Sequence, residues 1–414
     1  MTDATQLLTT ADGRPLKAAL AAAQARARRK AFFLVAPLLL FVVVTFILPI
    51  GQMLQRSIYH DGFSSNAPAL AAWFDENPDA MPDEAAYAAL AADLLLMKNN
   101  KTAGEAGTRI NYTVSGTRSL FTSSARNADD LQPPFTDALL AVDQKWADPL
   151  IWQAMRAAAS PYTTDFYLIA LDRQRTADGG TEVVAENQRI YLWLFGKTFV
   201  LSAVITIVCL LLAFPIAHLL ATLPMSKSNL LMILVLLPFW TSLLVRTTSW
   251  IVLLQGQGVV NNVLVSLGLV ADDGRITMIY NQTGTIIVMT HILLPFMVLP
   301  LYSVMRTIKP SYARAARSLG ATSWTTFRRI YLPQTLPGMG AGALLVFILA
   351  VGYYITPALV GGADGQLISN MIQFHMSKSN WSLAAALSGM LLLGVLLLYW
   401  LYDRLVGIDK LKLG

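Results

Sequence analysis

Six long apolar stretches constrain what this chain can fold into more than any other feature. They cover residues 31–54, 198–220, 230–254, 279–305, 341–361 and 383–402. A helix crosses the hydrocarbon core of a bilayer with about 20 mainly apolar residues, because its backbone N–H and C=O groups must be satisfied within the segment. Only 14% of the 414 residues are charged, against about 25% in soluble domains. The sequence predicts an all-α polytopic membrane protein with six transmembrane helices and excludes a soluble enzyme.

The charges are divided between two regions. Residues 57–190 hold 18 acidic and 10 basic residues, a net charge of −8, whereas the rest of the chain holds 7 acidic and 21 basic residues, a net charge of +14. A basic membrane core with an acidic hydrophilic insertion is a topology signature and does not indicate a nucleic-acid partner.

Basic residues set the expected orientation. A cluster that ends at Lys30 precedes the first apolar stretch, which is too long for a signal peptide and reads as an uncleaved anchor. If the N-terminus is cytoplasmic, the cytoplasmic segments carry 16 basic residues and the two short external loops only Arg275 and Lys378. The positive-inside rule therefore favours cytoplasmic N- and C-termini. We expect a cytoplasmic arm (1–30), a first transmembrane helix (31–56), an external insertion (57–190) and a five-helix membrane core (191–414) with a cytoplasmic loop at 306–337.

The external insertion reads as a small α+β domain. Apolar residues at helical spacing predict a helix over 83–97, and a second helix over 135–158 carries Trp146 and Trp152. Segments 166–171 and 181–184 flank Asp178-Gly179-Gly180, which predicts strand, turn and strand.

The loop between the fourth and fifth stretches carries the most specific signal. Pro310 suits the first turn of a helix and Gly320 suits a left-handed C-terminal cap, so residues 311–319 should form a short helix. Ser323 can cap a second helix that ends before Pro333. On charge alone, the arginines of this loop could be ordinary topology determinants.

The apolar and glycine positions favour a more specific interpretation. The loop resembles the EAA motif of permease subunits of type I ATP-binding-cassette (ABC) importers. The matching positions are Ala315, Ala316, Gly320, Ala321, Phe327, Ile330, Leu332 and Pro333. Arg314 departs from the pattern, because the family usually has Glu there. The resemblance implies a coupling helix that docks on a separate ATPase, whose contact with position 314 would be reversed or absent in this chain.

The resemblance extends over residues 195–405. Segments 237–246, 258–262 and 294–302, with Gly361-Gly362 and Asn380-Trp381, are similar to the spermidine/putrescine (PotB/PotH-like) branch of the binding-protein-dependent transport inner-membrane component family. That branch implies a non-catalytic permease subunit in a bacterial inner membrane, with a polyamine or related small cationic amine as substrate. It also implies a second permease subunit, two ATP-binding subunits and a periplasmic solute-binding protein, which the insertion could help to dock.

Five residues are candidates for the translocation pathway. Arg246 lies in an apolar stretch, where a charge is costly, and it either serves function or braces the fold. His291 either contacts a ligand or makes an interhelical hydrogen bond. Trp240, Tyr353 and Tyr354 could bind cations through their ring faces or anchor the protein at the membrane interface.

The sequence gives little support for a metal site, a nucleotide site or a catalytic centre. Cys209 is the only cysteine, and the four histidines are scattered without paired metal-ligand spacing. Gly196-Lys197-Thr198 resembles the end of a phosphate-binding loop, but Tyr191 replaces its first glycine, so ATP must bind to another polypeptide. We therefore expect no metal, directly bound cofactor or catalytic residue. The alternative functions are a nucleotide-independent secondary transporter or channel and, with less support, a membrane sensor. The inverted repeats and paired intramembrane charges common in secondary transporters are not evident in the sequence.

Overall fold

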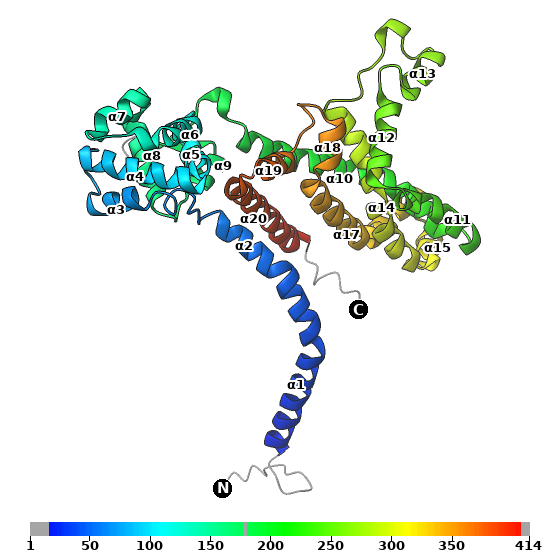
Figure 1. Cartoon of the computed structure of the whole chain (residues 1–414). Helices are drawn as coiled ribbons and strands as arrows, with labels where there is room; N and C mark the ends of the chain where they lie inside the picture. Colours follow the sequence, from blue (N-terminus) through cyan, green and yellow to red (C-terminus); the bar gives the residue numbers. More distant parts are fainter. Residues whose placement is uncertain (1–15, 177–179, 407–414) are drawn as a thin grey trace, which may run out of the picture. The chain divides into compact units, whose positions relative to one another are not determined.

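The computed structural model describes residues 16–176 and 180–406 and divides the chain into two compact units, 1–56 and 57–414 (Figure 1). The described part of the first unit is one long helix. It consists of α1 (Leu16–Val42), a π-helical turn (Val43–Ile47) and α2 (Leu48–Arg56). Its segment Ala23–Arg56 is long and apolar enough to cross a membrane, and the first predicted span, 31–54, lies within it.

Three helices form the centre of the membrane core in the second unit. They are α10 (Tyr191–Thr222), α14 (Gln282–Thr307) and α17 (Leu332–Gly352), which pack against one another around fully buried side chains such as Cys209, Met297 and Val346. The last long helix, α20 (Trp381–Val406), packs on α19 (Ile368–Ser377). Among the described residues, five helices meet the length and hydropathy needed for a span, and a bent pair makes a sixth if it counts as one. The predicted helical membrane fold is thus confirmed.

Two glycines bring α17 close to α14. A Cβ on Gly338 would lie 3.0 Å from the carbonyl oxygen of Pro300 and from Cβ of Val304, and a Cβ on Gly342 would lie 2.7 Å from Sδ of Met297. Their spacing is that of the small-x-x-x-small motif, which lets the backbones of membrane helices approach closely.

The third predicted span, 230–254, is sharply bent in the structure. α11 (Met225–Leu236) continues into a 3₁₀ turn (Leu237–Trp240) and is followed by α12 (Leu243–Leu254) and α13 (Val259–Ser266). The two halves meet at an angle of 98°. Pro238 has no N–H to continue the helix, and Thr241 and Ser242 are extended, so the chain changes direction there.

The fifth predicted span, 341–361, is displaced. The helix already includes residue 332, and α17 ends at Gly352 before a short break and α18 (Ile355–Val360). Hydropathy placed the span too late because the first turns of α17 contain polar residues and Pro337, which nevertheless remain helical.

The insertion is a mainly helical domain with a two-stranded antiparallel sheet, as the α+β prediction requires. Its elements are α3 (Pro68–Glu76), α4 (Glu84–Asn100), α5 (Ala103–Asn111), α6 (Thr117–Arg126), α7 (Phe135–Val142), α8 (Pro149–Ala159), α9 (Asp165–Ala170), β1 (Arg173–Arg175) and β2 (Thr181–Val183).

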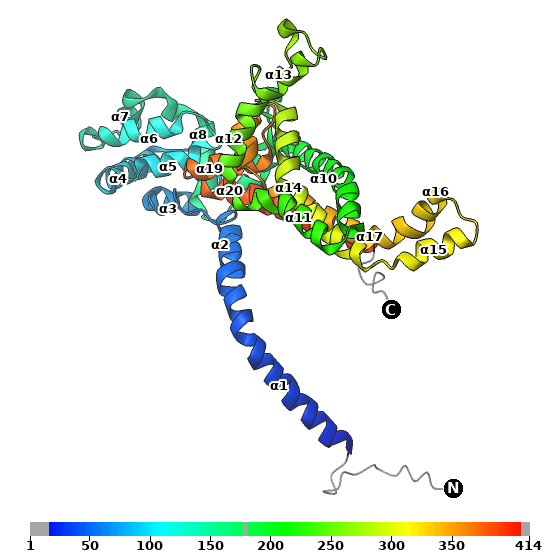
Figure 2. The same cartoon turned by 90° about the vertical axis from the view of Figure 1, so that its right-hand side faces the viewer.

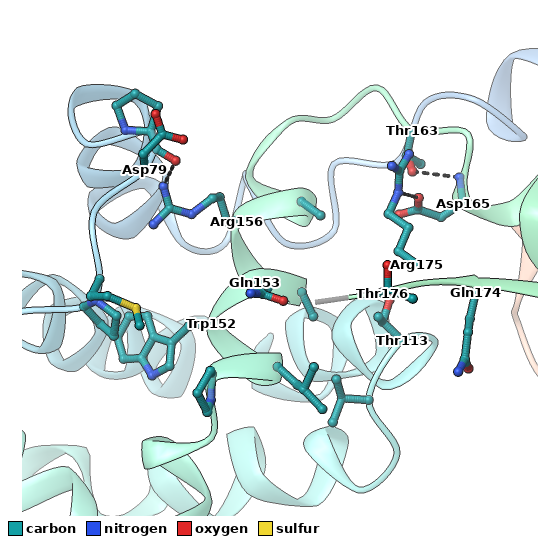
Figure 3. Close-up of a pocket in the computed structure, with 18 of the residues that line it drawn as sticks. Asp79, Thr113, Trp152, Gln153, Arg156, Thr163, Asp165, Gln174, Arg175 and Thr176 are labelled. Atoms are coloured by element: carbon teal, nitrogen blue, oxygen red, sulfur yellow. Dashed lines mark hydrogen bonds and ion pairs between the residues drawn. The ribbon is translucent and has the colours of Figure 1, made fainter. Parts of the chain in front are cut away.

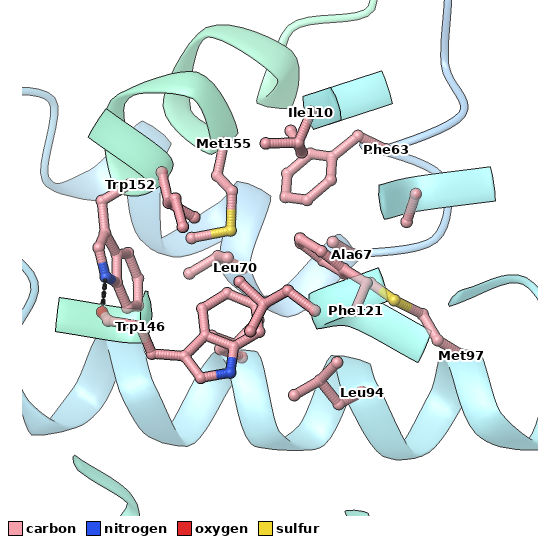
Figure 4. Packing of buried hydrophobic residues seen from close by; sticks show 14 of the residues in the cluster. Phe63, Ala67, Leu70, Leu94, Met97, Ile110, Phe121, Trp146, Trp152 and Met155 are labelled. Atoms are coloured by element: carbon pink, nitrogen blue, oxygen red, sulfur yellow. Dashed lines mark hydrogen bonds between the residues drawn. The ribbon is translucent and has the colours of Figure 1, made fainter. Parts of the chain in front are cut away.

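Aromatic side chains fill the core of the insertion (Figure 4). Trp146 is fully buried, and its Nε1 donates to Oγ of Ser124 at 2.9 Å. Its carbonyl oxygen accepts from Nε1 of Trp152 at 2.7 Å and from the hydroxyl of Tyr87 at 2.9 Å. Each polar group of this aromatic cluster has a partner, so the insertion has a hydrophobic core of its own whose tryptophans and tyrosine are hydrogen-bonded.

Three insertion elements can be compared with the sequence-based expectations. The helix expected over 83–97 is α4, whose first turn is capped by the Asp83 side chain accepting from the N–H of Ala86. The helix expected over 135–158 is two helices, because Asp143 and Asp148 each cap a new turn. The strand expected over 166–171 is wrong, since this segment is α9 and the strand follows at β1. Most of the expected turn, Asp178 and Gly179, lies outside the described residues.

Helix α9 and Asp172, two residues after its end, join the insertion to the membrane core. Phe166 and Ala170 of α9 are fully buried in one cluster with Leu194 of α10 and Leu387 of α20. The Asp172 carboxylate accepts hydrogen bonds from the backbone N–H groups at 190, 191 and 192, at 2.8–3.1 Å, and thus caps α10. The insertion is therefore packed and capped onto the core rather than tethered to it.

Candidate functional site

The predicted coupling loop forms two short helices that project from the core (Figure 2). The first is α15 (Pro310–Ser318), which is followed by Gly320 in the left-handed conformation, with a φ of +87°. Nothing lies within 4 Å of where a Cβ on Gly320 would stand, so its backbone conformation, not crowding, favours glycine. The side chains of Leu319 and Trp324 are 89% and 68% exposed. The loop therefore presents apolar groups without cover from the described chain.

The same loop is basic and carries unpaired cations. In the described ranges 16–176 and 180–406, the side chains of Lys309, Arg314, Arg328 and Arg329 make no ion pair or hydrogen bond. Arg306 is different, since it donates to the carbonyl oxygen of Ala221 at 3.0 Å. From residue 274 to residue 363 the sequence contains no Asp or Glu, so the cations have no acidic neighbour along this segment.

The second helix of the loop departs from the expectation in two ways. Its cap is Thr322 and not Ser323, because the Thr322 hydroxyl accepts from the N–H of Thr325 at 3.2 Å. Its end is also not before Pro333. α16 (Ser323–Thr326) continues through a π-helical turn (Phe327–Tyr331) directly into α17, and Pro333 is tolerated in the first turn of α17.

The motif positions divide between two faces of this loop. Arg314, Ala315, Gly320 and Pro333 are exposed, whereas the other motif positions are half-buried. The half-buried positions are Ala316, Ala321, Phe327, Ile330 and Leu332. Four of the nine positions are thus exposed and open to a partner, and five are partly covered by the rest of the chain.

Arg246 satisfies the backbone at the bend between α11 and α12. Its guanidinium donates to the carbonyl oxygen of Pro238 and, at 2.9 Å, to that of Thr241. These carbonyls lie at the end of the 3₁₀ turn, where that of Pro238 also accepts from the backbone N–H of Thr241 at 3.3 Å and from the Thr241 hydroxyl at 2.9 Å. The geometry shows Arg246 bracing the bend, one of the two roles its sequence position left open.

His291 makes an interhelical hydrogen bond. Nε1 of Trp250 on α12 donates to Nδ1 of His291 on α14 at 3.0 Å. Trp250 and Tyr353 pack against the same buried cluster, which includes Ile292 of α14. Trp240 does not belong to a buried cluster, since 77% of its surface is exposed.

Tyr353 and Tyr354 form the break between α17 and α18. Their carbonyl oxygens accept hydrogen bonds from the Ser369 hydroxyl at 2.5 Å and from the Asn370 side-chain amide at 2.8 Å. The two tyrosine rings stand out in the sequence, but Ser369 and Asn370, whose side chains hold the broken backbone, do not. The sequence Gly352-Tyr-Tyr followed by Pro357 could have indicated the break.

The insertion has an open pocket of about 880 Å³, shown in Figure 3. One arginine on its wall, Arg156, donates to the carbonyl oxygens of Asn77, Pro78 and Ala80 and lies over the ring of Phe74. The guanidinium of Arg156 therefore already holds the loop after α3, and the second lining arginine is also paired.

That second arginine belongs to a buried ion-pair cluster. Arg175 donates to one carboxylate oxygen of Asp165 at 2.5 Å, and the buried Arg109 donates to the other at 3.0 Å. Burial alone would raise the pKa of Asp165, but the hydrogen bonds and charges of the two arginines outweigh it and lower the pKa. Both carboxylate oxygens of Asp165 are thus paired, whereas the buried Nε of Arg109 has no hydrogen-bond partner among the described residues. Within the part of the chain that the structure describes, no group of three His, Cys, Asp or Glu side chains could hold a metal ion.

Residues 183–407 match the family described as the binding-protein-dependent transport system inner membrane component. The chain belongs to this family. It is 39% identical over 211 residues to the spermidine/putrescine transport system permease protein PotB of Escherichia coli (strain K12), covering 50% of this chain and 76% of the relative.

Two further similarities are weaker. The inner membrane ABC transporter permease protein YdcU of Escherichia coli (strain K12) is 32% identical over 226 residues, covering 52% of this chain and 72% of the relative. A bacterial ABC transporter that imports the acidic polysaccharide alginate matches with a TM-score of 0.49 and 17% identity, covering 61% of this chain and 86% of the other. The identity to the alginate transporter is too low for residue roles to be transferred from it to this chain.

Family membership decides between the alternative functions. The chain is a non-catalytic permease subunit of an ABC importer and not a nucleotide-independent secondary transporter or channel. It is a multi-pass inner membrane protein that works with ATPase and solute-binding partners. The prediction of a PotB/PotH-like permease is confirmed. Residues 57–182 of the insertion lie outside the family match.

Proposed function

We propose that this chain forms one half of the translocation pathway of an importer for polyamines or related small cationic amines. A second permease subunit would form the other half, two ATP-binding subunits would supply the energy, and a periplasmic binding protein would deliver the solute. The observation that carries the proposal is the 39% identity, over 76% of its length, to a permease named for spermidine and putrescine.

The test is an uptake assay with the whole transporter. A host strain lacking its own polyamine uptake would express this chain with its partners and receive radiolabelled putrescine or spermidine. We expect saturable uptake that is lost when the ATPase subunit carries an inactivating substitution in its nucleotide site. Uptake that persists with the inactive ATPase would contradict the ATP-driven mechanism. ATP-dependent uptake of another solute class, with none of either polyamine, would contradict the substrate.

We further propose cytoplasmic N- and C-termini and an external insertion. The support is the distribution of basic residues, 16 in the segments placed inside and two in the two short external loops, together with the net charge of −8 of the insertion. Because Cys209 is the only cysteine, a Cys209→Ser background gives a clean assay. A cysteine introduced for Ser311 should react with a membrane-impermeant maleimide in inside-out vesicles and not in intact spheroplasts; the reverse pattern would refute the orientation.

We propose that the exposed half of the coupling loop docks in an acidic groove of the ATPase. The support is the unpaired cations of the loop and the exposed Leu319 and Trp324. In an ordinary family member a Glu would occupy position 314, so a groove that suits Glu would repel Arg314. A partner with acidic residues facing position 314 restores attraction through charge complementarity.

Charge reversal at position 314 tests this docking. Arg314→Glu should weaken binding of the ATPase to the permease by about threefold to tenfold at low salt, as expected for the reversal of a partly exposed ion pair. The effect should shrink at about 0.5 M salt, because exposed charges are screened. Arg314→Gln is the matched control and should fall between wild type and Arg314→Glu. Tighter binding by Arg314→Glu would contradict the proposal, because it would show that the groove suits the Glu that the family usually has at this position.

We propose that the translocation pathway is lined by Trp240, His291, Tyr353 and Tyr354. Arg246 would stabilise the bend between α11 and α12, which forms part of the wall of this pathway. None of the acidic residues between 191 and 406 lies in α10, α11, α12, α14 or α17. Selection of cations would then depend on the aromatic rings and on carboxylates of the second permease subunit. Trp240→Ala should raise the KM for polyamine uptake, and an unchanged KM would contradict a pathway role for this exposed ring.

We also propose that the insertion helps to dock the binding protein or the sister permease. The support is its proposed external placement and its own hydrophobic core. Met81 and Tyr162, on the rim of the pocket, are 78% and 69% exposed. Replacing both by Asp should reduce the stimulation of ATP hydrolysis by the binding protein, and unchanged stimulation would argue against docking at this face.

A further inference from the structure

The junction between the coupling loop and the core is built around a π-helical turn. The turn covers Phe327–Tyr331, and the N–H of Leu332 donates to the carbonyl oxygen of Phe327, five residues earlier. α16 and α17 therefore form one continuous helix through this turn. Single π turns inside α-helices are uncommon and occur often at functional sites. Any displacement of α16 therefore reaches α17 directly through the backbone. Helix α10 is separate from this continuous helix and can receive the displacement only through side-chain contacts.

Three rings form a column along this junction. The centroids of Trp324 and Phe327 are 5.7 Å apart with an interplanar angle of 24°, and those of Phe327 and Tyr331 are 6.2 Å apart with an angle of 27°. The column begins at the exposed Trp324 of the coupling loop and ends at the half-buried Tyr331. It thus extends from the surface offered to the partner to the edge of the helix bundle.

The cytoplasmic end of α10 contacts this column at two points. The rings of Phe214 and Phe327 meet edge to face at 5.9 Å. One turn later, Nδ1 of His218 and the hydroxyl of Tyr331 are 2.8 Å apart, and the two rings are also edge to face at 5.1 Å. Phe214 and His218 are four residues apart on α10, as Phe327 and Tyr331 are in the π turn, so the two helices meet as matched pairs.

The hydrogen bond gives this contact a property that apolar packing lacks. Apolar side chains of neighbouring helices can slide past one another with little loss of contact, whereas a hydrogen bond weakens steeply with distance and angle. His218 and Tyr331 therefore fix the height of α10 relative to the coupling loop. Arg306 of α14 holds the following residues of α10 through the carbonyls of Ala221 and Leu223, so α10 is tied to both neighbours here.

We propose that His218 and Tyr331 are positioning residues that transmit movement of the coupling loop to α10. The ring column carries the displacement from Trp324 to Tyr331, and the hydrogen bond passes it to His218. This inference rests on the proposed docking of the loop on an ATPase. Without the contact, the ATPase would still move α17 but α10 would follow incompletely, so ATP would be hydrolysed with less transport.

The experiment measures ATP hydrolysis and solute uptake on the same assembled transporter in proteoliposomes. Tyr331→Phe keeps the ring column and removes only the hydroxyl, and we expect it to lower uptake per ATP by about threefold to tenfold, in line with the loss of one hydrogen bond. His218→Leu should give a similar loss. His218→Gln retains an acceptor for the hydroxyl and should recover part of the ratio. The double variant Tyr331→Phe/His218→Leu should be no worse than the larger single loss.

Tyr302→Phe on α14 is the matched control. Tyr302 is a half-buried tyrosine in the same cluster, and its hydroxyl makes no hydrogen bond within the ranges 16–176 and 180–406. It should leave the ratio unchanged. Because the ratio is taken on assembled complexes, a lower yield of a variant does not affect the outcome.

The outcomes separate this inference from the proposed function. If wild-type uptake proves independent of the ATPase, the proposed function fails. If wild-type uptake is ATP-driven but Tyr331→Phe and His218→Leu keep the wild-type ratio, the inference alone fails. Additive losses in the double variant would also overturn it, because they would show that the two residues act separately.

Discussion

Asp93 shows how one buried carboxylate joins two helices of the insertion. Its side chain lies on α4 and is nearly inaccessible, with 2% of the residue exposed. One oxygen accepts from the N–H of Ala69 at 3.1 Å and the other from the N–H of Leu70 at 2.7 Å, in the first turn of α3. Burial raises the pKa of Asp93 to about 6, outweighing these two hydrogen bonds, which lower it. The folded insertion therefore binds this proton more tightly than the unfolded chain does.

The sign of the resulting pH dependence follows. A carboxyl group whose pKa is raised by folding adds stability at low pH, and this contribution is lost as pH rises from about 4 through about 6. This contribution is at most about 3 kcal/mol, because folding raises the pKa from 3.8 to about 6. Asp93→Asn, which cannot ionise, should remove this component. Hydrogen exchange of α3 and α4 peptides, corrected for intrinsic rates, should show a smaller loss of protection between pH 4 and 6.5 than in wild type.

Asp83→Asn is the control for this comparison. Asp83 also accepts a backbone N–H at the start of a helix, but it is exposed. If Asp83→Asn changed the pH dependence of hydrogen exchange as much as Asp93→Asn does, the effect would not be specific to the buried carboxylate. Other groups, such as Asp165 with its lowered pKa, titrate in the opposite direction, so only the difference between variants is informative.

At the scale of elements, the contact between α14 and α17 depends on the absence of a side chain at Gly338. A methyl group there would stand 3.0 Å from a backbone carbonyl oxygen, which cannot move aside as a flexible side chain can. Gly338→Ala should therefore lower the free energy of unfolding by about 1–3 kcal/mol, the usual cost of overpacking a close contact. Thermal unfolding in detergent would measure it.

Gly196 on α10 provides the matched helical glycine. Nothing lies within 4 Å of where its Cβ would stand. Gly196→Ala should be neutral or stabilise the helix by up to about 1 kcal/mol, because alanine is the better helix former. If Gly338→Ala were as stable as Gly196→Ala, α14 and α17 would have to lie further apart than they do in the structure.

The sequence predicted elements where a local rule decides and missed those decided by tertiary contacts. Gly320 was expected in the left-handed conformation because few other residues adopt it. The short apolar run 166–171 suits either a strand or a helix, and in the structure it is a helix whose Phe166 and Ala170 are buried together with side chains of α10 and α20. The break at Tyr353 likewise depends on Ser369 and Asn370, which are distant in sequence.

The same distinction between local patterns and tertiary contacts applies to the candidate site. The spacing of the coupling motif revealed the loop, because it is fixed along the chain. The pairing of His218 with Tyr331 spans 113 residues and leaves no local pattern. The bracing role of Arg246 could be weighed but not decided from the sequence, because it depends on where Pro238 turns the chain.

At the scale of the whole second unit, the insertion and the membrane core behave as one body if their junction holds. The junction consists of the apolar contacts of α9 and the cap that Asp172 provides for α10. Deleting residues 57–190 would remove both and expose the buried surfaces of α10 and α20. A loss of transport after such a deletion would therefore not distinguish a docking role from damage to the core.

A substitution at Asp172 tests the junction without removing the insertion. Asp172 has a φ of +54°, so glycine fits its backbone, and Asp172→Gly removes the carboxylate without adding strain. Three backbone N–H groups then lose their acceptor, and we expect the free energy of unfolding to fall by about 1–3 kcal/mol. Hydrogen exchange should rise together in α9 and in the first turn of α10, while α4 keeps its protection. Asp172→Asn retains an acceptor and should lose less; faster exchange in α10 alone would show that the cap does not hold the two parts together.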